Sequence, residues 1–370
     1  MGYLGENIPK LGFGLMRLPK QGDEIDIAAT SAMVDRFLEA GFTYFDTAYG
    51  YAGSEEAIRK ALVERHPRES YQLATKLPAW AGPKTAEEAK AMFTTSLERT
   101  GAGYFDFYLL HNCGDSRTAA FDDFKMWEYV QELKAQGLVK HIGFSFHDHA
   151  DVLGDLLTKH PEMEFVQLQI NYGDWEDANV QARACFEVAQ KHKVPVIIME
   201  PVKGGMLAEP PKAVAEILKA ANPEASCSSW AMRFAGSLPG VITVLSGMSN
   251  MEQMEDNIAT MTDMKPFTDA ERAVLREATE AMAAIPSIPC TACRYCVKGC
   301  PQKINIPGIF SSMNRLLIYN SITGAKGGYA WETREGGKAE DCIGCGACER
   351  VCPQHIAIVD ELKKTGEALG

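Results

Sequence analysis

The chain has 370 residues, of which 46% are hydrophobic, and its formal net charge is −12. This length allows one large and one small domain with buried cores, and the acidic balance argues against nucleic acid as a partner. No apolar run approaches the roughly 20 residues that cross a bilayer, and Met1–Glu6 lacks the basic and apolar regions of a signal peptide. We therefore expect a cytoplasmic protein with no membrane partner.

Between residues 10 and 247, short apolar runs alternate with amphipathic segments, which is the pattern of repeated strand–helix units around a parallel sheet. Eight strands are predicted, at Lys10–Met16, Tyr44–Ala48, Tyr71–Lys76, Phe105–His111, Val139–Phe146, Phe165–Asn171, Val194–Pro201 and Val241–Gly247. Helices are predicted at Asp26–Ala40, Ser54–Glu64, Thr85–Thr100, Phe124–Gln136, Ala150–His160, Ala178–His192, Lys212–Ala221 and Met251–Met261. Eight such units predict an α/β fold of the (β/α)8 TIM barrel type. A doubly wound open sheet is the alternative, but no G-x-G-x-x-G motif follows the first strand.

A domain boundary is predicted after the barrel. One more helix is expected at Thr268–Ala284, and the prolines of Ile285–Pro289 then end it. Residues 1–284 are therefore assigned to the barrel, and residues 285–370 to a small, mainly helical domain. Within the small domain, Ile309–Tyr319 is predicted as a helix and the glycine-rich segment Gly324–Gly337 as a loop.

Eight of the 11 cysteines lie in two runs, Cys290–Pro301 and Cys342–Pro353, that share the spacing C-x2-C-x2-C-x3-C-P. This spacing is found in bacterial proteins with two iron–sulfur clusters, in which the fourth cysteine of one run binds the cluster of the other. The small domain is therefore predicted to be ferredoxin-like and to hold two [4Fe-4S] clusters. One cluster is assigned to Cys290, Cys293, Cys296 and Cys352, and the other to Cys342, Cys345, Cys348 and Cys300.

Two other uses of these cysteines are less consistent with the pattern. Zinc also binds C-x2-C pairs, but eight cysteines in two matching runs exceed the needs of one tetrahedral ion. Disulfides require an oxidising compartment, of which the sequence gives no sign. The remaining Cys113, Cys185 and Cys227 are interpreted as small buried hydrophobes. Exposed cubane clusters are generally oxygen-sensitive, which favours an anaerobic source.

Four chemically reactive side chains follow successive strands of the predicted barrel. Asp46 and Tyr51 come at or after the end of the second strand, Lys76 ends the third, and His111 ends the fourth. Because active sites of such barrels form at the carboxyl ends of the strands, we expect the four side chains to meet at one rim. An ammonium group favours ionisation of a neighbouring phenol, and an imidazole can orient a carbonyl oxygen. The set suits proton donation to a carbonyl that receives hydride, and a structural ion network is the alternative.

The chain resembles the aldo-keto reductase family from about Lys10 to Asn257, in the segments Phe45–Tyr51, Ala74–Lys76, Asp106–His111 and Ile142–Ser145. With its cysteine runs, the whole chain is similar to the branch of that family that carries a C-terminal ferredoxin-like domain. The resemblance implies that Tyr51 is the general acid/base of a tetrad with Asp46, Lys76 and His111. It also implies a nicotinamide cofactor bound without a Rossmann fold. Its implied contacts are Ser145 and Gln167 near the nicotinamide, Pro201, Lys203, Gly204 and Gly205 by the pyrophosphate, and Gly247, Ser249, Gln253 and Asn257 after the eighth strand.

Two positions depart from the family's pattern. The family commonly has Ser-Asn where this chain has Ser145 and Phe146, so an amide that would hold the nicotinamide is missing. No basic residue that would select a 2′-phosphate is evident in Gly247–Asn250. Arg17, after the first strand, and Lys203 are the alternative phosphate partners.

A hydride carries two electrons and a cluster carries one, so a converter such as a flavin is needed between them. Three functions are consistent with the sequence. The first is an NAD(P)H-dependent oxidoreductase of a small carbonyl or alcohol, whose clusters are structural or connect it to an external carrier. The second is a reductase with a flavin or a substrate radical in the barrel, supplied with electrons by ferredoxin. The third is a non-catalytic redox sensor or electron-transfer protein that uses the barrel as a scaffold. Trp80, Trp175, Cys113 and Asn112–Phe121 are expected to line the substrate pocket.

Overall fold

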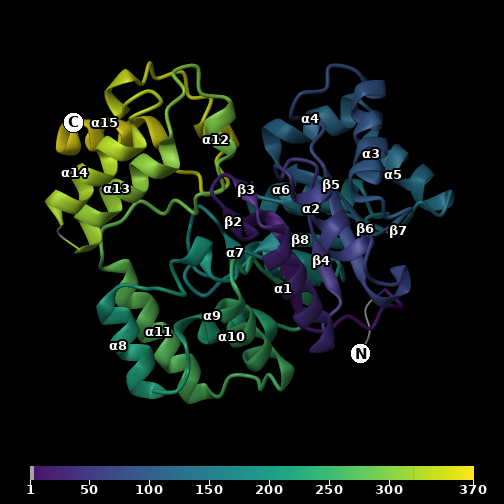
Figure 1. The fold of residues 1–370 in the computed structure, drawn as a ribbon, viewed down its shortest axis with the longest axis horizontal. Helices are drawn as coiled ribbons and strands as arrows, with labels where there is room; N and C mark the ends of the chain where they lie inside the picture. Colours follow the sequence, from purple (N-terminus) through teal and green to yellow (C-terminus); the bar gives the residue numbers. More distant parts are fainter. Residues whose placement is uncertain (1–3, 320) are drawn as a thin grey trace. The chain divides into compact units, whose positions relative to one another are not determined.

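A computed structural model describes residues 4–319 and 321–370, and in these residues eight parallel strands close into a barrel (Figure 1). The strands follow one another around the barrel in sequence order: β1 (Leu11–Gly14), β4 (Tyr44–Asp46), β5 (Gln72–Leu77), β6 (Phe105–Cys113), β7 (Val139–Phe146), β8 (Phe165–Gln169), β9 (Val196–Met199) and β10 (Val241–Ser246). The last strand pairs with the first, with Leu11 opposite Val244. The predicted barrel and its eight strands are confirmed. A two-stranded ribbon of β2 (Lys20–Gln21) and β3 (Glu24–Ile25) follows the first barrel strand.

Helices alternate with the barrel strands. They are α1 (Ile27–Glu39), α2 (Ser54–Ile58) with the π-helical turn η2 (Arg59–Val63), α3 (Ala86–Thr100), α4 (Asp115–Asp123), α5 (Met126–Ala135), α6 (Ala150–Lys159), α7 (Ala182–Lys191), α8 (Lys212–Ala221), α9 (Cys227–Gly236) and α10 (Met251–Thr262). Polar side chains fix where several of them begin, since Asp26, Thr85 and Asn250 accept hydrogen bonds from the first-turn amides of α1, α3 and α10. Gly101 ends α3 in the left-handed conformation that glycine adopts without strain.

Large side chains fill the interior of the barrel. Tyr44, Phe107 and Phe165 are fully buried, and both Tyr44 and Phe165 approach the Phe107 ring edge-on with centroids 5.1 Å apart. Gly143 makes room for this packing, because a Cβ atom there would lie 2.8 Å from the Phe165 ring. The barrel interior is thus a packed core, which leaves the carboxyl ends of the strands as the place for chemistry.

The chain forms two compact units. The first unit comprises Met1–Asp177, Gln181–Pro201 and Ser228–Phe267, and the second comprises Ala178–Val180, Val202–Cys227 and Thr268–Gly370. The second unit includes the segment after β9 because α8 packs against α11 (Asp269–Ala283) there.

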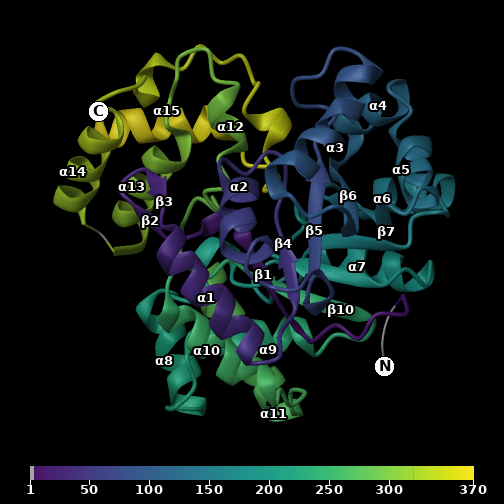
Figure 2. The same cartoon turned by 45° about the vertical axis from the view of Figure 1, so that its right-hand side comes forward.

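The cysteine-rich part of the second unit is helical, as predicted. It contains α12 (Tyr295–Lys298), α13 (Ile306–Tyr319), α14 (Ile322–Glu332) and α15 (Ile358–Leu369), with the 3-10 turns η5 (Ala339–Asp341) and η6 (Glu349–Val351). The three long helices α13, α14 and α15 lie side by side (Figure 2). Their apolar faces enclose a core that includes Ile309, Phe310, Tyr329 and Leu362 and also the thiols Cys296 and Cys348.

The prediction of a loop over Gly324–Gly337 is wrong for its first part, because Ile322–Glu332 forms α14. Tertiary packing overrides the low helix propensity of glycine here. Ala325 and Tyr329 are buried in the core of the unit, and a Cβ atom on Gly328 would lie 2.8 Å from Ser312 Oγ of α13. The missing side chain therefore lets the two helices approach closely.

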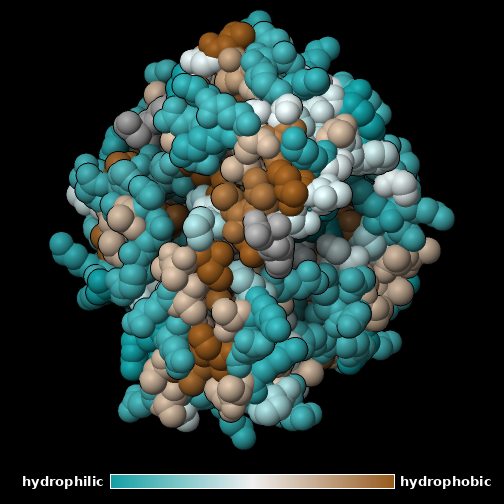
Figure 3. Space-filling model, turned by 90° about the vertical axis from the view of Figure 1, so that its left-hand side faces the viewer, coloured by the Kyte–Doolittle hydropathy of each residue, from teal (hydrophilic) through white to brown (hydrophobic). Residues whose placement is uncertain are grey.

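The surface is largely hydrophilic on the face shown in Figure 3, where hydrophobic residues gather in a band near its centre. The large hydrophobic side chains exposed by the described residues include Met16, Met251, Ile322, Trp331 and Ile343. Within residues 4–319 and 321–370, no helix is both long and apolar enough to cross a lipid bilayer.

Candidate functional site

A buried ion pair lies at the carboxyl end of the barrel. Asp46 is the last residue of β4 and Lys76 belongs to the neighbouring strand β5. Lys76 Nζ pairs with Asp46 Oδ1 and donates a second hydrogen bond, of 2.8 Å, to the carbonyl oxygen of Thr47. Lys76 is 1% exposed and Asp46 is 3% exposed. The parallel register of the two strands thus brings the carboxylate to the ammonium and holds it there.

Tyr51 and His111 complete the predicted group. The Lys76 ammonium nitrogen lies 4.9 Å from the centroid of the Tyr51 ring. The His111 ring, at the end of β6, meets the Tyr51 ring edge-on, with centroids 5.9 Å apart and an interplanar angle of 84°. The structure therefore brings together all four side chains that were predicted from three successive strands.

Burial disfavours the charged forms of Asp46, Lys76 and His111. It raises the pKa of the Asp46 carboxyl and lowers the pKa of the Lys76 ammonium, and each charge offsets part of the effect on the other. The pKa of His111 lies well below its ordinary value, mainly because of burial and then because of the cations Lys76 and Arg117 and the neighbouring His147. His111 is therefore a neutral imidazole near pH 7, able to act as a hydrogen-bond donor or acceptor.

The carboxyl end of β6 is hydrogen-bonded to the segments on either side of it. Trp80 Nε1 donates to the carbonyl oxygen of His111 over 2.7 Å, and the Asn112 amide donates to Ser145 Oγ over 2.8 Å. Arg117 lies in the segment Asn112–Phe121 that was expected to line the pocket, but its contacts were not predicted: it is 7% exposed and donates to the carbonyl oxygens of Asn112 and His147. The sequence of this helix has no apolar face that would indicate burial of the arginine, and the neighbouring carbonyl groups explain it.

Two predicted nicotinamide contacts lie on the next strands, β7 and β8. Ser145 Oγ accepts the Asn112 amide, which leaves its own hydrogen to donate, and Gln167 Oε1 is buried with no hydrogen bond from any described residue. A carboxamide offers an acceptor and a donor side by side, so these two side chains fit one. Phe146 is 2% exposed and its ring lies 6.4 Å from that of Phe144, so the residue in place of the family's asparagine is part of the core.

A second set of predicted cofactor-binding residues lies near η1 (Leu15–Arg17) and the start of α10. Ser249 Oγ donates to the carbonyl oxygen of Arg17 over 2.7 Å, and the Ser249 amide donates to Gln253 Oε1 over 2.8 Å. A Cβ atom on Gly247 would lie 3.6 Å from Arg17 Cδ, so the arginine stem lies along this glycine. Asn257 Nδ2 donates to Ser246 Oγ over 2.9 Å. The structure therefore places Arg17 beside the residues after the eighth barrel strand.

The predicted pyrophosphate contacts fall in different parts of the chain. Pro201 belongs to the first unit, whereas Lys203, Gly204 and Gly205 form the turn η4 in the second unit. All three turn residues have positive φ, of 48°, 65° and 104° respectively. Lys203 is 7% exposed, which is unusual for a lysine.

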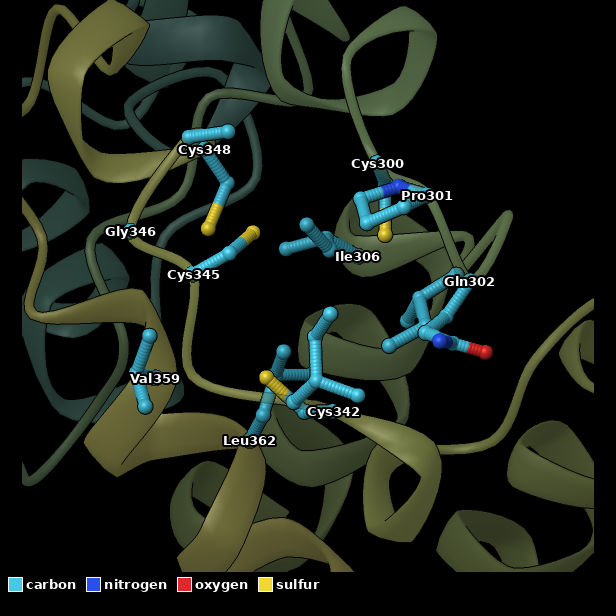
Figure 4. A pocket seen from close by; sticks show the side chains of 13 residues that line it. Cys300, Pro301, Gln302, Ile306, Cys342, Cys345, Gly346, Cys348, Val359 and Leu362 are labelled. Atoms are coloured by element: carbon cyan, nitrogen blue, oxygen red, sulfur yellow. The ribbon is translucent and has the colours of Figure 1, made fainter.

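The eight cysteines of the two runs surround two pockets in the second unit. One pocket is lined by Cys300, Cys342, Cys345 and Cys348, together with apolar side chains that include Ile306, Val359 and Leu362 (Figure 4). The other is lined by Cys290, Cys293, Cys296 and Cys352, with Ile306, Phe310, Ile356 and Ile358 in its lining. Each pocket therefore takes three cysteines from one run and the fourth from the other, which is the grouping assigned from the spacing.

The pockets offer the donor chemistry of a thiolate-bound cluster. Burial raises the pKa of the Cys296 thiol to about 12, and the nearby Cys290 and Cys352 thiols raise it further. The pKa of Cys348 is raised to about 11, again mainly by burial. Because metals bind the thiolate form, a positively charged group in each pocket is needed to hold these cysteines deprotonated near pH 7. Four sulfur donors in an apolar pocket fit an iron–sulfur cluster.

Two protein families match successive parts of the chain. The model of the Aldo/keto reductase family matches residues 10–280, and that of a 4Fe-4S dicluster domain matches residues 289–357. An aldo-keto reductase of Mycolicibacterium smegmatis is 31% identical over 141 residues, which are 38% of this chain and 47% of the relative. The oxidoreductase YqkF of Bacillus subtilis, described as uncharacterized, is 24% identical over 315 residues, or 76% of this chain and 95% of the relative.

Solved structures share the barrel. An aldo-keto reductase from Klebsiella pneumoniae in complex with NADPH superposes with a TM-score of 0.57 at 22% identity, covering 73% of this chain and 90% of that protein. A likeness at this identity shows the fold. The chain spans about half the length of the first curated relatives that it matches, 47% and 56% of two of them. The family model matches most of the chain, and the dicluster model matches the segment that contains both cysteine runs. This chain therefore belongs to the aldo/keto reductase family and carries a C-terminal 4Fe-4S dicluster domain.

Proposed function

We propose that the chain is an NAD(P)H-dependent oxidoreductase that reduces a small carbonyl compound, or oxidises the corresponding alcohol, with Tyr51 as general acid/base. The observation that carries this proposal is the position of the Tyr51 ring, 4.9 Å from the buried Lys76 ammonium and edge-on to the His111 ring. A positive charge beside a phenol favours the phenolate, so it assists release of the phenolic proton. Asp46 keeps that positive charge in place by pairing with Lys76.

Each residue of the group has a separate task in this proposal. When bound, NAD(P)H supplies the hydride that adds to the carbonyl carbon. Tyr51 donates its proton to the carbonyl oxygen, so that the product is a neutral alcohol, and the same proton returns in the reverse direction. The neutral His111 imidazole orients the carbonyl oxygen by a hydrogen bond. The burial of Lys76 and Asp46 excludes water from the pair that supports the phenol.

The proposed cofactor contacts divide by chemistry. Ser145 and Gln167 hold the carboxamide, because one offers a hydroxyl hydrogen and the other a buried oxygen without a hydrogen bond from the described residues. Arg17 is the proposed partner of a 2′-phosphate, since its stem lies along Gly247 and its carbonyl holds Ser249. The NADPH complex of the Klebsiella pneumoniae structure supports a nicotinamide cofactor in this barrel.

The proposed metal centres are two [4Fe-4S] clusters, one in each four-cysteine pocket. The match to a 4Fe-4S dicluster domain supports them over zinc. Clusters of this kind pass single electrons, so the proposed external partner of the second unit is a one-electron carrier such as ferredoxin.

Replacement of Tyr51 by phenylalanine tests the proposed acid/base. Tyr51→Phe keeps the ring beside His111 but removes the proton, so kcat for NAD(P)H-dependent carbonyl reduction should fall by about 100-fold or more. Binding of NAD(P)H, followed by its fluorescence, should stay within about twofold. Tyr49→Phe is the matched control from the same loop, because its ring contact with the Arg99 guanidinium, 4.5 Å from the ring centroid, does not need the hydroxyl.

Two results of this experiment would contradict the proposal. Unchanged NAD(P)H-dependent turnover in Tyr51→Phe would exclude Tyr51 as the proton donor. Redox turnover that never uses NADH or NADPH, with wild-type and Tyr51→Phe proteins equally active, would favour a non-catalytic barrel that serves as a scaffold for electron transfer.

A flavin-dependent reductase supplied with electrons by ferredoxin is the second candidate. Two observations favour it: the eight cysteines arranged for one-electron carriers, and the core position of Phe146, which supplies no amide to a nicotinamide. Anaerobic purification followed by denaturation and chromatography of the released cofactor separates the candidates. Release of stoichiometric flavin would establish the second candidate, and its absence would eliminate it.

A further inference from the structure

A close backbone contact joins the turn after β9 to the first cysteine run. A Cβ atom on Gly204 would lie 2.8 Å from both Thr291 Cα and the Thr291 carbonyl oxygen, closer than a side-chain atom is tolerated. Both residues belong to the second unit, and Gly204 has a φ of 65°. Position 204 therefore requires glycine for two reasons, its backbone conformation and its neighbour.

Thr291 is part of the wall of a cysteine pocket. It is 2% exposed and lies between Cys290 and Cys293, which line that pocket with Cys296 and Cys352. The segment just before it is fixed from α13, because Asn314 accepts the Ile288 amide over 2.7 Å and donates to the Ile288 carbonyl oxygen over 2.8 Å. The cysteine loop is thus anchored on one side by α13 and touches Gly204 on another.

The turn at 203–205 is strained and needs support from its surroundings. Lys203 adopts a φ of 48°, in the left-handed region that costs a residue with a side chain about 1 kcal/mol or more. The turn closes on itself, since the amides of Gly205 and Leu207 both donate to the carbonyl oxygen of Val202, over 3.0 and 3.1 Å. Such a conformation persists where neighbouring groups determine it, and Thr291 is a neighbour in direct contact.

We infer that occupancy of the pocket formed by Cys290, Cys293, Cys296 and Cys352 fixes the shape of the turn Lys203–Gly205, with Gly204 as the positioning residue. Binding of a cluster by Cys290 and Cys293 immobilises Thr291 between them, and Thr291 then limits where Gly204 can lie.

Hydrogen exchange measured anaerobically tests the structural part without reference to activity. The amides of residues 202–209 should exchange faster after iron is removed than in the holoprotein, whereas peptides from the barrel strands should exchange equally in both. Equal exchange of residues 202–209 with and without iron would overturn the inference.

A pair of neighbouring glycines supplies the matched variants, both studied as holoprotein. Gly204→Ala and Gly205→Ala share the strain of a side chain at positive φ, but nothing lies within 4 Å of a Cβ atom on Gly205. We expect Gly204→Ala to alter the electron paramagnetic resonance of the reduced clusters and to lose iron faster to a chelator, and Gly205→Ala to match the wild type in both. Identical spectra and iron loss in the two variants would overturn the inference, because the Thr291 contact would then have no effect on the pocket.

Discussion

The pair of Asp46 and Lys76 is the residue-scale feature on which the proposed chemistry depends. Both side chains are almost fully buried, and burial disfavours the charged form of each. The pair is therefore stabilised by mutual attraction and by the hydrogen bond from Lys76 to the Thr47 carbonyl oxygen, against a large desolvation cost. Removal of one partner should lower the free energy of unfolding by more than the intact pair adds to it, because the other charge stays buried without its partner.

Asp46→Asn should lower the free energy of unfolding by about 3 kcal/mol, since it leaves the buried Lys76 ammonium without a carboxylate. The pKa of Lys76 should fall further below its ordinary value, so activity at neutral pH should fall as well. Urea denaturation and the pH dependence of kcat measure the two effects. Asp35→Asn is the control, because Asp35 pairs with Arg65 at the surface and its loss should cost below about 1 kcal/mol. Equal losses in the two variants would contradict the account of the buried pair.

The identity of the four grouped residues could be predicted from the sequence, but their protonation could not. Asp46, Lys76 and His111 lie at or within two residues of the carboxyl ends of their strands, and the carboxyl ends of neighbouring parallel strands meet at one rim. The low pKa of His111 depends instead on burial and on Lys76 and Arg117. Arg117 lies in Asn112–Phe121, the segment expected to line the pocket, but nothing in the residue pattern there indicates that its charge acts on His111.

At the scale of elements, strands were easier to predict than helices. Each barrel strand is buried along most of its length, so an apolar run marks it directly, as in β7, which was predicted with its observed bounds. Helix α7 begins at Ala182, four residues later than predicted, and α9 was not predicted at all. Helix α14 was missed because its glycines indicate a loop, and only Ser312 on the facing helix explains why one of them is needed.

Two adjacent glycines of α14 should respond differently to alanine. Gly327 is exposed with no atom near a Cβ position, so Gly327→Ala should stabilise the second unit by about 1 kcal/mol through helix propensity. Gly328→Ala should lack this gain, because its Cβ atom displaces the Ser312 hydroxyl from its 3.0 Å hydrogen bond to the Gly308 carbonyl oxygen. Chemical denaturation of the holoproteins measures the difference of about 1 kcal/mol. A larger gain from Gly328→Ala than from Gly327→Ala would contradict the close packing of α13 and α14.

At the scale of the whole molecule, the chain has separate cores of different kinds. The barrel interior is built from large apolar side chains such as Phe107 and Ile197, with no cysteine in that cluster of described residues. The core of the second unit includes Cys296 and Cys348, and Cys290, Cys300, Cys342 and Cys352 pack against it. The stability of the small core should therefore depend on what its thiols bind, as in other small domains that need a metal.

Iron removal should accordingly divide the unfolding of the chain into two steps. In calorimetry under anaerobic conditions, the iron-depleted protein should show an early transition from the second unit and a later one at the temperature at which the barrel of the holoprotein unfolds. Limited proteolysis should release fragments from residues 290–370 first. One transition that shifts as a whole on iron removal would contradict this independence.

Each pocket takes its fourth cysteine from the other run, and this arrangement sets the order in which the two pockets become complete during translation. The pocket that starts at Cys290 is completed by Cys352, and the pocket that starts at Cys342 already has its first sulfur at Cys300. A growing chain that has reached residue 341 therefore carries three sulfur donors for one site and one for the other, and neither set is complete. For the proposed clusters, the pocket of Cys300 is complete once Cys348 has been translated and the pocket of Cys290 only after Cys352, in both cases after the last strand of the barrel.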